Sequence, residues 1–149
     1  MKNTKEILKK YKKIAIVGAS KDLTKTSSIV MKYLQKSGFK VFPVNPSMKG
    51  QEILGEKVFA SISEIESPVE IIDVFRPSNE AIDIAKEAVK IGAKVLWLQL
   101  DIKNEEAKKI VESNLDLIFE IDRGEITRIS KISFLGDKKI KEKRLRDII

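Results

Sequence analysis

The stretch from residue 14 to residue 28 constrains the fold most, because its character changes abruptly at one glycine. The uninterrupted apolar run Ile14-Ala15-Ile16-Val17 precedes Gly18. A run without polar alternation is typical of a strand buried on both faces of a parallel sheet. A segment rich in Ser, Thr and Lys follows Gly18, and apolar residues then recur at helical spacing from Ile29. The stretch predicts a strand, a turn and a helix whose N-terminus faces the turn, which favours a bound phosphate or another anion.

The turn after Gly18 departs from the glycine pattern of ordinary dinucleotide sites. Such sites read Gly-x-Gly-x-x-Gly and have an acidic residue about 20 positions further on that binds a ribose diol. Ser20 and Leu23 stand where the second and third glycines would be, and the next strand ends in Asn45. We therefore expect no ordinary NAD site. A turn that only connects a strand to a helix is the alternative interpretation.

Strands and helices are predicted to alternate along the rest of the chain. Further strands are expected over residues 39–44, 69–75, 94–99 and 116–121, and the segment from 47 to 56 is expected to be a loop. Ser78 is the expected N-cap of the helix that ends at Gly92. Right-handed crossovers then give an α/β fold, a doubly wound parallel sheet of about five strands with helices on both faces.

The expected domain covers residues 1–123, with its core over 12–123, and a basic arm or helix follows over 124–149. We expect this arm to pack on the domain or on a partner, and homodimerisation through its apolar edge is one alternative.

Composition excludes several kinds of chemistry. The chain has 149 residues, no cysteine and no histidine. Disulfides, thiol catalysis and histidine-based general base catalysis are therefore excluded, and we expect neither a metal site nor catalytic residues. No apolar run reaches the ~20 residues that a membrane span needs, and the N-terminus lacks an apolar signal core. We expect a cytoplasmic protein with no membrane partner.

The formal net charge of +7 resides at the two ends of the chain. Basic residues are concentrated in residues 1–13 and 124–149, whereas residues 14–123 are slightly acidic. Lysine-rich ends are usually solvated, and no aromatic residues that could stack on bases alternate with these lysines. Nucleic acid is therefore disfavoured as a partner.

Polar residues and turn formers follow each predicted strand. They lie at residues 18–20, 45–46, 75–77, 99 and 122–123. Ligands of doubly wound sheets bind outside the carboxyl ends of the strands, where the strand order reverses. These segments should therefore converge on a ligand crevice. The pair Asp122 and Arg123 is interpreted as a structural salt bridge.

The strand ends also carry a recognisable set of motifs. They read Val-Gly-Ala-Ser at 17–20, Pro-Val-Asn-Pro at 43–46, Asp-Val-Phe-Arg-Pro at 73–77 and Trp-Leu-Gln-Leu at 97–100. In this order and spacing the chain, over residues 12–123, resembles the CoA-binding domain family of small bacterial and archaeal proteins. That family shares its fold with the N-terminal domain of the succinyl-CoA synthetase α subunit. The resemblance implies a Rossmann-like fold that binds CoA or acyl-CoA.

The resemblance also implies a set of binding residues. The phosphate turn would comprise Gly18, Ala19, Ser20, Lys25, Thr26 and Ser27. Asn45 and Pro46 would border the nucleotide, Phe75, Arg76 and Pro77 would border the adenine or pantetheine side, and Gln99 is a further candidate contact. Lys25-Thr26 replaces the usual Arg-Pro of the family, which keeps a charge but loses a bidentate fork.

The residues and the resemblance favour the same ligand. CoA carries a pyrophosphate and a 3′-phosphate, which need helix N–H groups and cations rather than a diol-binding acid. Lys21, Lys25 and Arg76 are the candidate cations. We expect a CoA-binding protein without catalytic machinery of its own. The alternatives are an enzyme that acts on acyl-CoA, a nucleotide-linked reductase using the same crevice, and a non-catalytic interaction domain that uses the basic arm.

Overall fold

The computed structural model describes residues 4–98, 105–112 and 118–121. The candidate contact Gln99, the pair Asp122 and Arg123 and the predicted arm over 124–149 lie outside the described residues.

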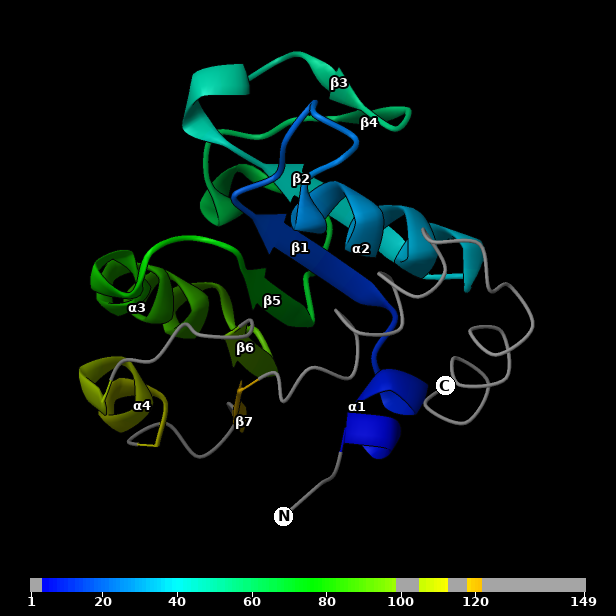
Figure 1. The fold of residues 1–149 in the computed structure, drawn as a ribbon. Helices are drawn as coiled ribbons and strands as arrows, with labels where there is room; N and C mark the ends of the chain where they lie inside the picture. The colour runs from blue at the N-terminus through cyan, green and yellow to red at the C-terminus, as the bar shows by residue number, and fades with distance from the viewer. Residues whose placement is uncertain (1–3, 99–104, 113–117, 122–149) are drawn as a thin grey trace.

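A parallel sheet forms the centre of the molecule (Figure 1). Its strands are β1 (Lys13–Val17), β2 (Lys40–Val44), β5 (Ile71–Val74), β6 (Val95–Leu98) and β7 (Ile118–Ile121). They pair in the order β2-β1-β5-β6-β7, and every pairing is parallel. The predicted α/β fold with about five parallel strands is confirmed.

Helices cover both faces of this sheet, as predicted (Figure 1). The helices α1 (Thr4–Lys10) and α2 (Thr26–Lys36) pack on one face, and α3 (Ala81–Ile91) and α4 (Glu105–Glu112) pack on the other. Alternate strand residues point to the two faces, so each face has its own apolar core. None of the helices in the described ranges has the length and apolar character required to cross a membrane.

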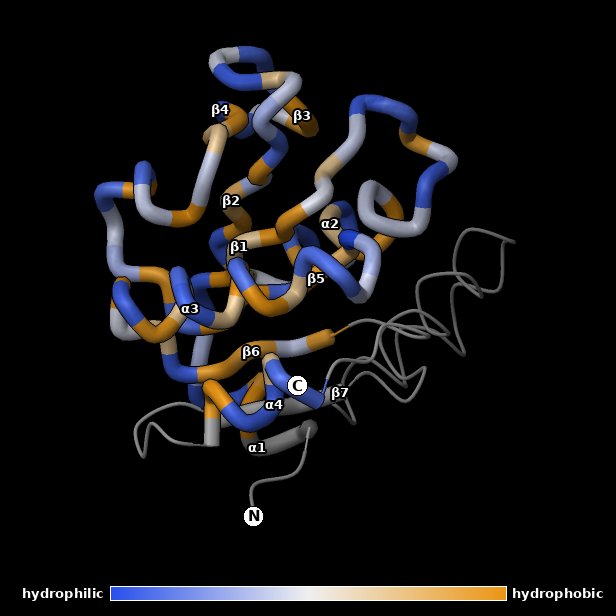
Figure 2. Tube along the Cα trace, turned by 90° about the vertical axis from the view of Figure 1, so that its left-hand side faces the viewer, coloured by the Kyte–Doolittle hydropathy of each residue, from blue (hydrophilic) through white to orange (hydrophobic). Residues whose placement is uncertain are grey.

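The strands are apolar because both of their faces are covered. All four residues of β5 and of β6 are buried, and Figure 2 shows β1 and β6 largely in the colours of apolar residues, with polar loops above them. Trp97 is 1% exposed and belongs to the core. One polar residue, Asp73, lies among the buried residues of β5 at 2% exposure.

Two local predictions were wrong. The segment expected to be a loop contains a 3₁₀ turn, η1 (Pro46–Met48), and a small antiparallel hairpin of β3 (Glu52–Ile53) and β4 (Glu56–Lys57). Its strands are too short to give a periodic pattern, and both residues of its turn, Leu54 and Gly55, have positive φ, as a type I′ turn requires.

Ser78 does not occupy the N-cap position expected for it. Ser78 begins a 3₁₀ turn, η3 (Ser78–Glu80), so the α3 helix starts one turn later, with Glu80 at its N-cap and no side-chain cap bond. Pro77 fixes the start of this tighter turn, and a 3₁₀ turn commonly precedes an α-helix. Gly92 ends α3 in the left-handed conformation, as predicted.

The strand order places a topological switch point between β1 and β5. The chain runs from β1 to its neighbour β2 on one side and then crosses to β5 on the other side. Crossovers that diverge from such a point leave a crevice outside the carboxyl ends of the two strands. These are the ends that carry Gly18 and Phe75.

The opposite, amino end of the sheet is held by Glu70. Its Oε1 accepts hydrogen bonds from the backbone N–H groups of Lys12, at 3.0 Å, and Lys13, at 3.1 Å. These groups are partly buried, so without the carboxylate they would lose their partners.

Replacing Glu70 with Ala should therefore lower the free energy of unfolding by about 1–3 kcal/mol, because two backbone donors lose a charged acceptor. Urea denaturation followed by the fluorescence of Trp97 measures the change. Glu66→Ala, which alters an exposed residue in the preceding loop, should change the stability by less than about 0.5 kcal/mol. Equal losses in the two variants would contradict the role given to Glu70.

Candidate functional site

A cleft of about 410 Å³ opens at the switch point. It lies between the carboxyl ends of β1 and β2, the segment around residues 60–62 and the start of α3. Its lining residues are Val17, Gly18, Val44, Asn45, Pro46, Ser47, Ala60, Ser61, Ile62, Arg76, Glu80, Ile84 and Glu87. Topology alone predicted a ligand crevice at this position.

A second cavity of about 400 Å³ lies between β2, the segment 57–59 and the residues that follow η2 (Ile62–Glu64). It is lined by Phe42 and Phe59, whose rings meet edge to face, and by Lys49, which pairs with Glu64 at 3.1 Å. No predicted site residue lines it, and its lining includes none of the residues that follow β1 or β5. We therefore take the cleft at the switch point as the candidate site.

Gly18 is required by the backbone at the floor of the cleft. Its φ is +97°, a conformation that side chains disfavour. A Cβ placed there would lie 2.8 Å from the carbonyl oxygen of Phe75 and 3.0 Å from Cδ of Arg76. Because Phe75 also donates its N–H to Val17 at 2.8 Å, the ends of β1 and β5 approach as closely as a glycine allows.

The turn after Gly18 is tied to the end of β2. The N–H groups of Gly18 and Ala19 both donate to the carbonyl of Val44, at 2.9 and 3.2 Å. The Asn45 side chain donates from Nδ2 to the carbonyl of Ala19 at 2.8 Å, and its Oδ1 accepts from both N and Oγ of Ser47. The first two amides of the turn are therefore used within the protein, and Asn45 acts as the bracket that holds the turn.

The loop from residue 20 to residue 25 is ordered by its own side chains. Ser20 Oγ accepts from the N–H of Asp22, and Oδ1 of Asp22 accepts from both N and Oγ1 of Thr24. The hydrogen bond from the Thr24 side chain, followed by that from its backbone, lowers the pKa of Asp22 below the ordinary aspartate value. Any stabilisation from this depressed pKa is present above the ordinary value and is lost as the pH falls through the lowered one.

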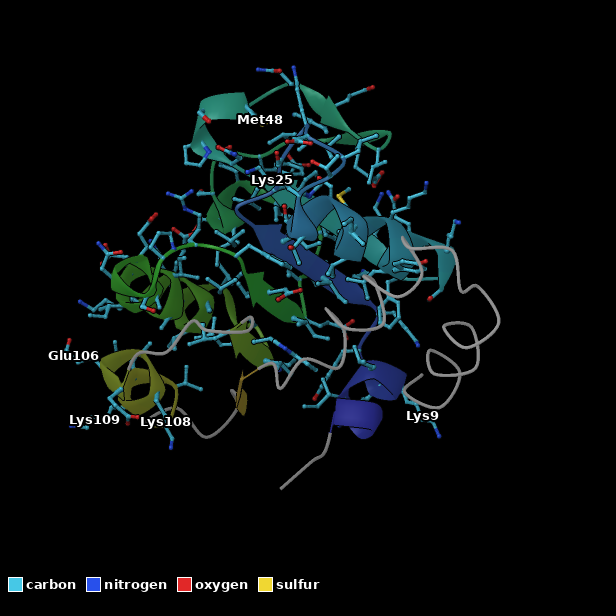
Figure 3. The ribbon with its side chains drawn as sticks, in the orientation of Figure 1. Lys9, Lys25, Met48, Glu106, Lys108 and Lys109 are labelled. Atoms are coloured by element: carbon cyan, nitrogen blue, oxygen red, sulfur yellow. The ribbon has the colours of Figure 1, made fainter. Side chains whose placement is uncertain are left out.

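The α2 helix begins at this loop with unused donors. Within the described part of the chain, the N–H groups of Thr26 and Ser27 donate to no backbone acceptor, and Lys25 at the N-cap makes no side-chain cap bond. The exposed side chains of Lys21 and Lys25 belong to the same loop, and Figure 3 shows Lys25 at the same end of the molecule as Met48 of η1. Free N–H groups beside cations form an anion site at a helix N-terminus.

Arg76 lines the cleft and forms an ion pair with Glu80. Its Nε and Nη2 donate to the two carboxylate oxygens of Glu80, at 3.2 and 2.8 Å. Both side chains remain about two-fifths exposed, at 44% and 43%. A second carboxylate of the cleft, that of Glu87, accepts a hydrogen bond from the N–H of Ile62 at 3.0 Å.

The structure brings part of the predicted set together. Gly18, Asn45, Pro46 and Arg76 line the cleft. The other described candidates do not line it: Ala19, Ser20, Lys25, Thr26 and Ser27 form the adjoining turn and helix start, and Phe75 and Pro77 flank Arg76.

Sequence reasoning missed Ser47, the segment 60–62 and the residues of α3. Glu80, at the N-cap of α3, and Ile84 and Glu87, within α3, follow one another at helical spacing, and all three line the cleft. The helical spacing of these three residues can be read from the sequence. The sequence does not indicate which end of the sheet this face of the helix lies against. Within the ranges that the structure describes, no cluster of acidic residues could hold a metal ion.

Replacing Gly18 with Ala should destabilise the protein more than the same change at Gly50. Both glycines have positive φ, but a Cβ at Gly50 would meet no atom within 4 Å. Gly50→Ala should lower the free energy of unfolding by about 1 kcal/mol, the cost of the backbone conformation. Gly18→Ala adds a collision with the Phe75 backbone and should cost about 2–4 kcal/mol. Similar losses in urea denaturation would show that the strand ends can separate freely.

Comparison with curated proteins reveals two related sequences. The chain is 40% identical over 108 residues to YneT, an uncharacterized protein of Bacillus subtilis, and the match covers 72% of this chain and 78% of YneT. It is 32% identical over 83 residues to an ADP-forming acetate–CoA ligase of Methanocaldococcus jannaschii. That match covers 56% of this chain and 12% of the ligase, so the similarity concerns a small part of that enzyme.

A solved structure supports the same relationship. A protein from Thermus thermophilus superimposes with a TM-score of 0.76 at 34% identity, over 82% of this chain and 92% of that one. The model of the CoA binding domain family matches residues 12–120, which include all the described strand ends of the cleft. The chain therefore belongs to the CoA binding domain family.

Proposed function

We propose that this protein binds coenzyme A or an acyl-CoA at the switch-point cleft and has no catalytic machinery of its own. The observation that carries the proposal is the junction of two features. A cleft lined mostly by uncharged residues, with one arginine and two glutamates among them, adjoins a helix start with unused N–H donors and two lysines. A molecule with a compact polar phosphate part and a long uncharged part is complementary to both.

The chemistry of the donors supports a polyphosphate group. The N–H groups of Thr26 and Ser27 and the cation of Lys25 would hold the pyrophosphate, because oriented amides and a nearby charge favour oxyanions. Arg76, at the lip of the cleft, is a further cation within the same site. The amides of Gly18 and Ala19 are engaged with Val44, so their part in the proposal is to shape the turn.

The same residues argue against an ordinary NAD site. A diol-binding acid would be expected at the end of β2, where Asn45 stands. The Asn45 amide is already engaged with Ala19 and Ser47, which makes it a structural bracket rather than a ribose ligand. A reductase that uses this cleft is therefore disfavoured.

The proposal of binding without catalysis rests on the available side chains. The chain has neither histidine nor cysteine, the usual general base and thiol nucleophile. The carboxylates in the cleft, Glu80 and Glu87, both accept hydrogen bonds from protein donors. The similarity to a short part of an acetate–CoA ligase is consistent with a binding unit that other proteins combine with catalytic domains. We further propose a cytoplasmic location and a small-molecule rather than a nucleic-acid partner.

Coenzyme A should raise the melting temperature, because a ligand that binds only the native state stabilises it. At about 100 times Kd the gain in free energy of unfolding is about 2.7 kcal/mol. Thermal denaturation with coenzyme A, acetyl-CoA, ADP, NAD and NADP checks this. Stabilisation by the CoA compounds, with little or none by NAD, is the expected pattern. Absence of any stabilisation by coenzyme A would refute the proposal.

The contribution of Lys25 can be separated from general charge effects. Lys25→Met should weaken coenzyme A binding about two- to fivefold at low salt, with a smaller difference at high salt, since the interaction is exposed and screened. Lys36→Met removes the same charge from the opposite end of α2 and should leave Kd almost unchanged. Calorimetric titration gives both values. Equal effects would mean that Lys25 acts only through net charge.

A further inference from the structure

The one cation that lines the cleft is neutralised by a carboxylate of the same cleft. Of the residues that line it, all within the described part of the chain, Arg76 is basic and Glu80 and Glu87 are acidic. Glu87 is engaged with the backbone of Ile62. Glu80 instead takes both of its hydrogen bonds from Arg76.

The stem of Arg76 lies beside Gly18. Its Cδ would be 3.0 Å from a Cβ placed on that glycine. The following residue, Pro77, has a fixed φ and precedes η3. The guanidinium, bonded to Glu80, lies at the junction between the cleft and the turn that begins at Gly18.

The partner of Arg76 occupies the edge that a phosphate would use. The Nε and Nη2 groups form one side of the guanidinium fork, and two parallel bonds from such a side are the usual way in which arginine binds carboxylate or phosphate. The pair is exposed, so it contributes little to stability and can exchange at small cost. An anion that enters the cleft at Arg76 would therefore have to replace the Glu80 carboxylate on the Nε and Nη2 side of the guanidinium.

We propose that Glu80 is a specificity-determining residue that competes with the ligand for Arg76. This inference rests on the proposed function, since it assigns Arg76 to the anionic part of the ligand. A ligand with an organic diphosphate, which offers several oxyanions and a high charge, displaces Glu80. A ligand with one weakly charged group leaves the pair intact, so Glu80 disfavours simple carboxylates and monoanions at this cleft.

The test is a double-mutant cycle on the full chain. Glu80→Gln keeps the shape and an acceptor oxygen but removes the charge, and Arg76→Met keeps an apolar stem beside Gly18. The probes are coenzyme A and inorganic pyrophosphate, with Kd measured by calorimetric titration and native folding checked by the fluorescence of Trp97. Glu56→Gln is the matched control, because Glu56 also pairs with an exposed cation, Lys40, but does not line the cleft.

Competition predicts that Glu80→Gln tightens binding of both probes about two- to fivefold, the range expected when an exposed ion pair is released. In the Arg76→Met background the same change should have an effect below about 1.5-fold, because the contested group is gone. Glu56→Gln should also change Kd by less than about 1.5-fold. An equal gain with and without Arg76 would overturn the inference, since Glu80 would then act by general repulsion.

The two probes distinguish failure of this inference from failure of the proposed function. If pyrophosphate binds more tightly to Glu80→Gln in the presence of Arg76 only, while coenzyme A binds to neither protein, the competition stands and the CoA proposal fails. If both probes bind to the wild-type protein and to Glu80→Gln with the same Kd, the CoA proposal stands and the competition fails. If neither probe binds to any variant, both are overturned.

Discussion

The close approach of three strand ends around Gly18 is the constraint on which the site depends. The N–H of this glycine donates to the carbonyl of Val44 at the end of β2. Because Gly18 has no side chain, the carbonyl oxygen of Phe75, which follows β5, can lie within 2.8 Å of the position that a Cβ would take. These neighbours stand on either side of the point where the strand order reverses. The packing of the sheet and the shape of the cleft are therefore set by the same contact. A larger residue would have to move the β5 end and Arg76, which follows it.

The charges near the cleft are divided between two regions. The turn and the start of α2 present lysines and unused amides, whereas the cleft lining contains more carboxylates than cations. This division suits a ligand that is anionic in one part and uncharged in another. Arg76 lies where the two regions meet, and its pairing with Glu80 makes the local charge depend on whether an anion is present. The charge where the two regions meet therefore depends on one exposed ion pair.

Most of the sheet and part of the cleft could be predicted from the sequence. The strands were found because burial on both faces leaves continuous apolar runs, as over Ile71–Val74. The hairpin between residues 52 and 57 was missed because strands of two residues have no measurable periodicity. The Ser78 cap was predicted wrongly because a tighter turn, started by Pro77, comes before α3. Glu80 and Glu87 were missed because helical spacing identifies a face but not what it adjoins.

The sequence by itself determined the fold class, the family and the residues that end each strand, because these follow from local burial patterns and short motifs. The tertiary structure decided how those residues are used. Asn45 became a bracket for the turn through its bond to Ala19, and Arg76 became paired with Glu80 at the lip of the cleft. The bracket joins segments 26 residues apart in the chain. The Arg76–Glu80 pair is local, at i,i+4 spacing, but it lies at the cleft because β5, which precedes it, pairs with β1. The physical reason is that such positions exist only after the parallel strands have assembled in their final order.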